Sequence, residues 1–204
     1  MRIPTILCFS TFMMLMLTTE TQATAILAEN TTDVTLTSGA LLGSLGFSVT
    51  PTGTAELVTG SNPPEVMFPI TGGAAMGGYL MIEHNGSGLA LSNGTTTVDI
   101  GNFLVDTKDL VVDSYVGAPA APTVPIFNIV PNSPLELTLT SGAATALNTA
   151  FDTTDFTAGL EIGTVVTNPV LAPEAPTWVM LAGGFAALGF AASRRRLRSV
   201  NAVA

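Results

Sequence analysis

The chain has 204 residues and a mean hydropathy of +0.52, and it carries fifteen acidic residues against six basic ones. Between residues 26 and 172 there are thirteen acidic side chains and one basic side chain, so the net charge of this region is 1 − 13 = −12. Such a surface repels phosphates and anionic headgroups, which excludes nucleic-acid binding and favours cations or a basic partner.

The first 25 residues predict a secretion signal. Arg2 supplies a positive charge, residues 6–17 form an apolar run too short to span a bilayer, and Ala23 and Ala25 form a small-x-small cleavage pattern. The alternative is a buried core helix, which leaves the cleavage pattern without a role. We therefore expect export across the inner membrane and a mature chain that begins at Ile26.

The single cysteine, Cys8, lies inside the apolar run of this signal. After cleavage the mature protein has no thiol, which excludes disulfides, cysteine nucleophiles and thiolate metal sites. The mature protein must therefore be stabilised by its own core or by partners.

Residues 26–171 predict a single extracellular all-β domain, β-sandwich-like, with one or two short helices. This region is rich in Thr, Val, Leu, Gly and Pro, and its short alternating runs are separated by turn residues. The expected strands are 33–37, 46–50, 55–59, 65–70, 79–84, 88–91, 96–100, 103–106, 109–115, 124–130, 135–140 and 159–167. The expected turns are 51–53, 62–64, 72–73, 85–86, 93–94 and 131–132.

Two identical pentapeptides interrupt the alternation. Residues 36–40 and 139–143 both read Leu-Thr-Ser-Gly-Ala, and Ala/Leu-rich residues follow each copy. Ser38 and Ser141 are expected to cap short helices at 40–45 and 143–150. A structural duplication and a chance match both explain the repeat.

The C-terminal segment predicts a membrane helix at residues 178–192, which would rise about 22 Å and span a bilayer only marginally. Trp178 is suited to one interface, and the arginine cluster from Arg194 to Arg198 is expected to stay cytoplasmic. This orientation places the acidic domain on the outer side of the membrane. Residues 199–204 form a C-terminal extension.

The tail, residues 172–198, resembles the PEP-CTERM protein-sorting signal. The resemblance lies in Pro173, Glu174, Ala175, Pro176, Trp178, the apolar helix, and Arg194, Arg195 and Arg196. It implies export by the general secretory route, cleavage by an exosortase, which is an integral-membrane cysteine protease, and association with the envelope or extracellular polysaccharide. The usual motif is Pro-Glu-Pro, whereas here Ala175 intervenes. The alternative is a plain C-terminal membrane anchor.

Segments 68–73, 82–89 and 124–129 resemble the β-rich modules of haem-transport-associated (Hta-type) surface proteins, and this resemblance implies haem binding. His84 and Tyr79 are residue types that ligate haem iron. Five residues apart on a regular strand, they are expected to point to opposite faces. The alternative interpretation is a histidine beside the turn at 85–86 that hydrogen-bonds the backbone.

The acidic residues Asp99, Asp106, Asp109 and Asp113 raise two alternatives, a calcium site or solvated strand edges. The sequence lacks the Asp-x-Asp-x-Asp-Gly loop, which favours the strand edges, and it lacks a nucleophile elbow and a phosphate-binding glycine loop. We therefore predict no metal site, no catalytic residues and no enzyme. The expected function is that of an exported surface or extracellular-matrix-associated structural or interaction protein, and the alternative is a haem-binding surface module.

Overall fold

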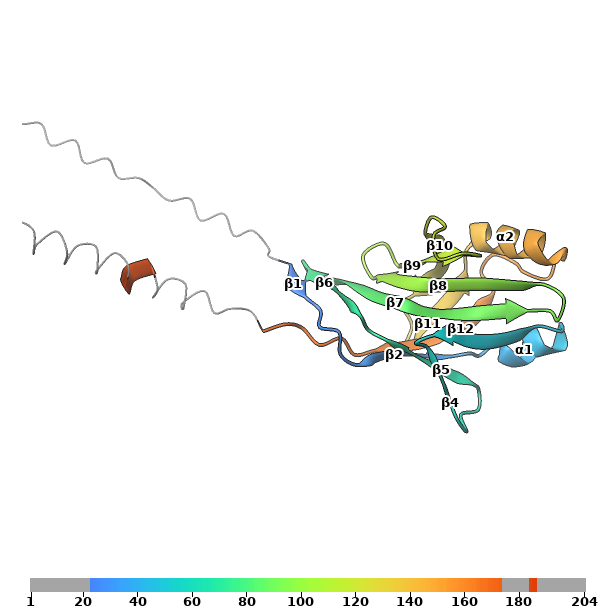
Figure 1. Ribbon diagram of the computed structural model, residues 1–204, viewed down its shortest axis with the longest axis horizontal. Helices are drawn as coiled ribbons and strands as arrows, with labels where there is room; N and C mark the ends of the chain where they lie inside the picture. Colours follow the sequence, from blue (N-terminus) through green and yellow to red (C-terminus); the bar gives the residue numbers. More distant parts are fainter. Residues whose placement is uncertain (1–22, 174–183, 187–204) are drawn as a thin grey trace, which may run out of the picture.

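The computed structural model describes residues 23–173 and 184–186 (Figure 1). It confirms the prediction of an all-β protein, because one antiparallel sheet of twelve strands curls around a core. Most of the predicted signal and the tail from Glu174 onward lie outside the described residues, apart from 184–186, which are helical. Over the described residues, no helix combines the length and the apolar character needed to cross a membrane.

The elements follow one another as β1 (Thr24–Ala25), β2 (Thr31–Thr35), α1 (Gly39–Ser44), β3 (Ser48–Gly53), β4 (Glu56–Val58), β5 (Glu65–Pro69), β6 (Gly72–Met76), β7 (Tyr79–Ser92), β8 (Thr97–Asp106), β9 (Val111–Val116), β10 (Val124–Val130), β11 (Leu135–Leu139), α2 (Ser141–Phe151) and β12 (Glu161–Thr167). The order in the sheet is β1-β6-β7-β8-β9-β10-β11-β12-β2-β5-β4, and β3 pairs with β7.

The sheet curls where bulges in neighbouring strands coincide. The pairing of β7 with β8 shifts register between His84 and Gly88, and the pairing of β8 with β9 shifts between Gly101 and Leu104. The Asn102 side chain accepts a hydrogen bond of 2.8 Å from the Gly86 N–H and joins the two bulges. Because each bulge bends its strand and increases its twist, a row of bulges lets one sheet wrap around a core.

The expected turn at 85–86 was therefore wrong, and residues 79–84 and 88–91 belong to one strand. The expected turns at 51–53 and 72–73 were also wrong, since these residues lie in β3 and β6. Gly73 serves close strand packing, because a Cβ there would lie 2.1 Å from the Met81 carbonyl oxygen. The turn at 93–94 is confirmed, and the Asn93 side chain accepts hydrogen bonds from two backbone N–H groups that follow it.

The core consists of inward-facing residues from β2, β5 and the six strands from β7 to β12, together with residues of the two helices. At the helical end, Phe47 packs edge-on against Phe151 and Phe156, with ring centroids 5.0 and 5.1 Å apart. Edge-to-face packing is a favoured arrangement of aromatic rings, and here it fixes α2 to the sheet. A separate small cluster of Ile26, Ile70 and Ile82 lies where β1 and β6 leave the body.

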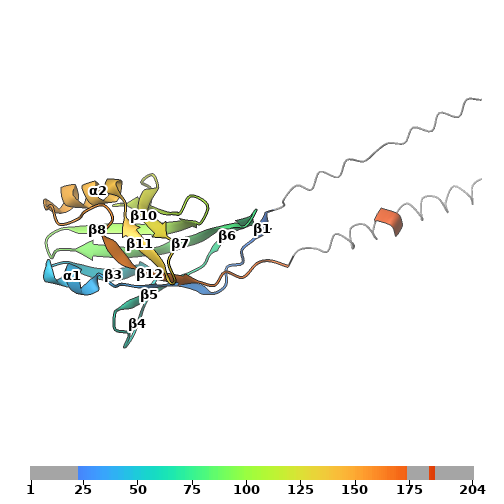
Figure 2. The same ribbon diagram turned by 180° about the vertical axis from the view of Figure 1, so that it is seen from behind.

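The two copies of the repeated pentapeptide both connect a strand to a helix, but their backbones differ. Thr140, at the N-cap of α2, is extended, whereas Ser38, at the N-cap of α1, is not. The strands that precede the two copies, β2 and β11, flank β12 on its two sides. Both helices lie at the same end of the domain (Figures 1 and 2). Ser38 is the N-cap residue of α1 as predicted, but its hydroxyl donates to the Ile162 carbonyl instead of capping the helix. The predicted cap at Ser141 was wrong, because Thr140 caps α2 by accepting from the Ala143 N–H.

The two ends of the described body run side by side at the end opposite the helices (Figure 2). The Ala172 N–H donates to the Ala25 carbonyl, and the Leu27 N–H donates to the Val170 carbonyl, each at 2.8 Å. An isolated bridge pairs Ile26 with Leu171. Strand β1 itself lies within the segment predicted to be the signal peptide.

Candidate functional site

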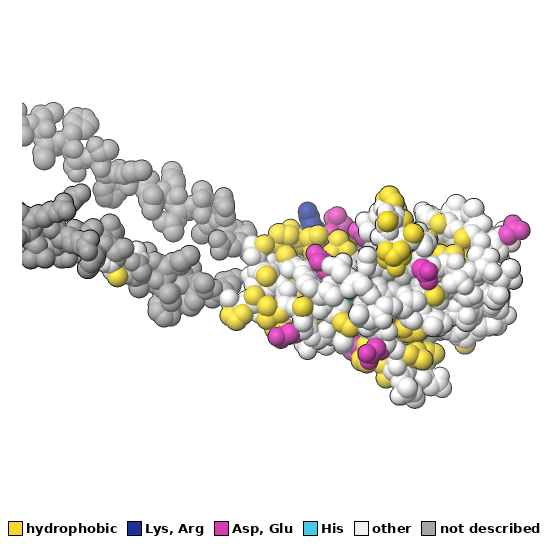
Figure 3. Space-filling view, viewed as in Figure 1, with side chains coloured by type: hydrophobic (Ala, Val, Ile, Leu, Met, Phe, Trp, Pro, Cys, Tyr) yellow, Lys and Arg dark blue, Asp and Glu magenta, His cyan; other side chains and the backbone are white. Residues whose placement is uncertain are grey.

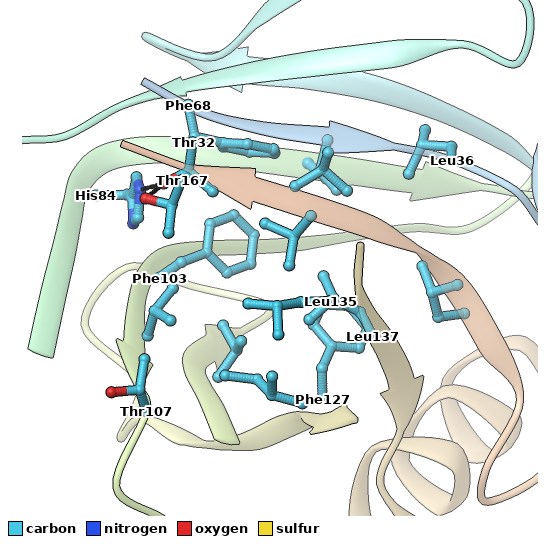
Figure 4. A pocket seen from close by; sticks show the side chains of 17 residues that line it. Thr32, Leu36, Phe68, His84, Phe103, Thr107, Phe127, Leu135, Leu137 and Thr167 are labelled. Atoms are coloured by element: carbon cyan, nitrogen blue, oxygen red, sulfur yellow. Dashed lines mark hydrogen bonds between the residues drawn. The ribbon is translucent and has the colours of Figure 1, made fainter. Parts of the chain in front are cut away.

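His84 is the most deeply buried titratable residue among those described, with 1% of its surface exposed. It points from β7 into the interior, where its Nε2 atom lies 2.8 Å from the Thr32 hydroxyl of β2. A second hydrogen bond of 2.9 Å joins Thr32 to the Thr167 hydroxyl of β12. Figure 4 shows this chain of three polar side chains at one side of an otherwise apolar cavity. His84 thus links β7 to two strands that do not neighbour it in the sheet.

Burial lowers the pKa of His84 to about 4, and the Phe103 backbone opposes this effect to a smaller extent. The Nδ1 atom is buried without a hydrogen-bond partner of good geometry. The edge of Phe68 packs near the imidazole, with ring centroids 6.4 Å apart. His84 is therefore neutral at pH 7, and its one hydrogen bond of good geometry joins Nε2 to the Thr32 hydroxyl.

The interpretation of His84 as a turn-side residue bonded to the backbone was wrong. The Asn85-Gly86 dipeptide forms part of a bulge, so His84 stays in the strand and faces inward. Tyr79 lies on the opposite face, as the spacing of five predicts, and the Lys108 Nζ atom lies 5.5 Å from its ring centroid. The two residues do not converge on a common ligand.

Two adjoining cavities of about 60 Å³ each lie in the interior of the described body. The first lies against His84, and the second lies beneath α1 and α2, where Leu42 and Leu147 contribute to its lining. Leu36, Leu89, Phe127 and Ile162 line both cavities and form a waist between them. Alternating hydrophobicity identifies such residues as inward-facing, but it does not reveal the space that they leave.

These two cavities are too small for haem. Each has a volume of about 60 Å³, and haem is a rigid, planar macrocycle that cannot be divided between two cavities separated by a waist of side chains. The Nε2 atom of His84 is also occupied by Thr32. The arrangement of His84 and Tyr79 therefore favours a structural role for both.

The acidic residues of β8, β9 and the turn between them interact with one another and with the backbone of that turn. Burial, and then the carboxylates of Asp106 and Asp109, raise the pKa of Asp113. The Asp106 side chain accepts hydrogen bonds from the N–H groups of Lys108 and Asp109, which holds the turn after β8. In the described part of the chain, no three potential metal ligands are grouped. Figure 3 shows acidic side chains scattered over this face, an arrangement that fits solvated strand edges.

The predicted processing residues lie mostly outside the described part. Ala23 and Ala25 are exposed, and Ala25 pairs with Ala74 of β6. Pro173 is exposed at the end of the body. Glu174, Ala175, Pro176, Trp178, Arg194, Arg195 and Arg196 lie outside the described residues.

No family model, curated protein or solved structure matches this chain. The sorting signal in the tail and the haem-transport-associated module in the core therefore stay predictions.

Proposed function

We propose that this chain is an exported surface or extracellular-matrix-associated protein with a structural or interaction role. In this proposal an exosortase-type protease recognises its C-terminal tail, and the acidic β domain is then displayed at the cell surface or released. The observation that carries the proposal is the pairing of the two ends of the body at the end opposite the helices.

This pairing supports tethered display for a geometric reason. Leu27 and Val170 are hydrogen-bonded to each other and Ile26 pairs with Leu171, so the two ends of the body that begins at Ile26 lie side by side (Figure 1). A chain held by its tail then directs this end toward the membrane and the two helices away from it. Neither end has to pass across the body.

The charge of the domain supports the same arrangement. The net charge of −12 between residues 26 and 172 repels anionic headgroups, which keeps the domain away from the bilayer. The domain can then contact basic partners or cation-bridged polysaccharide in the envelope.

Haem binding, the alternative function, is less favoured. His84 is buried and hydrogen-bonded, and neither interior cavity has the volume that haem requires. The proposed role therefore uses the outer surface of the domain.

Surface labelling of intact cells tests the proposal. An epitope placed in the exposed loop at residues 61–64, between β4 and β5, is expected to react in intact cells. Replacing Arg194, Arg195 and Arg196 by glutamine removes the charge expected to hold the tail inside, so the unprocessed chain should accumulate. Lysine at the same positions is the matched control and should preserve display. Labelling only after lysis, or equal processing of the glutamine and lysine variants, would contradict the proposal.

A further inference from the structure

The two interior cavities are arranged along the length of the domain. The first extends from Thr32 and His84 to the waist at Leu36, and the second continues from the waist to α2. Figure 4 shows His84, Thr32 and Thr167 at one side of the first cavity and Leu36 at the other. The apolar space thus runs from the polar chain at His84 toward the helices, interrupted only by side chains.

The size and lining of these cavities indicate the class of occupant. Protein interiors rarely leave voids larger than a water molecule, whereas each 60 Å³ cavity has space for about four to six water-sized groups. Water is a poor occupant, because it needs two to four polar partners and most of the residues that line the two cavities are apolar. The occupant that suits this lining is apolar, narrow and linear.

The polar residues that line the first cavity indicate a neutral end group. They are His84 and three threonines, and His84 is uncharged at pH 7 because burial lowers its pKa. Lys108, the one basic side chain of the domain, lies over the Tyr79 ring on the outer face. A carboxylate would therefore enter an acidic domain without a cation to meet it. Thr167 is half-buried and lies on the side of the cavity that His84 and Thr32 form (Figure 4).

We propose that the interior of the curled sheet binds a neutral molecule with an unbranched alkyl chain of about eight to twelve carbon atoms, as two joined cavities would hold. The chain runs through both cavities once Leu36 and Leu89 at the waist turn aside. Its hydroxyl or ester group lies beside the Thr167 hydroxyl, which bonds to Thr32 and has capacity for one more hydrogen bond. This site is independent of the display proposed for the domain and needs no step at the tail.

Titration with 1-octanol, followed by NMR of the methyl groups of Leu, Ile and Val, tests this proposal. The full-length chain is kept in CHAPS, a detergent built on a steroid skeleton that has no long unbranched alkyl chain. We expect saturable shifts at Leu36, Leu89 and Ile162, and an affinity at least tenfold lower for octanoate. Shifts that do not saturate, or that are confined to exposed methyls such as Val166, would overturn the proposal. Equal affinities for the alcohol and the carboxylate would overturn the assignment of a neutral ligand.

A matched pair of variants on β12 separates the interior from the surface. Val165 is 7% exposed and lines the first cavity, whereas its neighbour Val166 is 50% exposed on the outer face. Val165→Phe should weaken octanol binding at least tenfold, and Val166→Phe should leave it unchanged. If circular dichroism shows that Val165→Phe is unfolded, Val165→Leu replaces it, with an expected loss of at least threefold. Equal binding by the inward and outward variants would overturn the site.

Discussion

Acidification should destabilise the protein through His84 more than through any other described residue whose pKa is shifted. The imidazole is buried and its pKa is lowered from 6.5 to about 4. Below pH 6.5 the unfolded chain binds a proton at this residue that the folded chain does not bind, so the free energy of unfolding falls as the pH falls. At about 1.4 kcal/mol per pH unit, the difference between the two pKa values corresponds to about 3 kcal/mol.

The stabilisation is present in full above pH 6.5 and is lost between pH 6.5 and about pH 4, where the folded protein also takes up the proton. Asp113 has the opposite effect, because its pKa is raised in the folded state and its contribution grows as the pH falls through this range. Asp113 is unchanged in a variant at position 84. Its contribution to the pH dependence of the free energy of unfolding therefore cancels when the wild type and the variant are compared.

Urea unfolding of the wild type and of His84→Gln, followed by circular dichroism between pH 7 and pH 4, measures this contribution. Glutamine cannot titrate, but it can still hydrogen-bond the Thr32 hydroxyl. The wild type should lose about 3 kcal/mol more than the variant on going from pH 7 to pH 4. Parallel curves for the two proteins would refute the conclusion that a neutral, buried His84 is required by the fold.

Two further predictions concern the curl of the sheet and the helical end. Gly101→Ala should destabilise the protein by about 1 to 3 kcal/mol, because the new Cβ would lie 2.7 Å from the Ser87 carbonyl oxygen. Gly142→Ala, a control with open space around the Cβ, should be neutral or slightly stabilising in urea unfolding. Phe47→Ala should cost about 3 to 5 kcal/mol by removing the centre of the aromatic cluster, whereas the exposed Leu57→Ala should stay within about 0.5 kcal/mol. A loss as large for Leu57→Ala as for Phe47→Ala in thermal unfolding would contradict the assigned core.

Sequence patterns predicted the parts of the fold that depend on local chemistry. The strand at Val124–Val130 has the expected bounds, and both short helices begin within two residues of the expected positions. The dipeptide Asn85-Gly86 was wrongly predicted to form a turn, because its capacity for positive φ suits a hairpin turn and a bulge equally well. Only the pairing with β8, which is a nonlocal contact, distinguishes the two.

The interior site could not be predicted from sequence patterns, because it is formed by nonlocal contacts. The partner of His84 is Thr32, which lies 52 residues away on a strand that does not neighbour β7 in the sheet. Strand periodicity correctly separated Tyr79 from His84, since it acts over a few residues. It could not reveal that His84 is buried against two threonines or that cavities adjoin it, because both follow from the curl of the whole sheet.

The central proposal, export followed by processing of the tail, is tested most directly by mass spectrometry of the intact protein from its native host. The proposal predicts a chain that begins at Ile26 and lacks the C-terminal segment containing Arg194, Arg195 and Arg196. A chain recovered with Met1 and Ala204 both in place would contradict it.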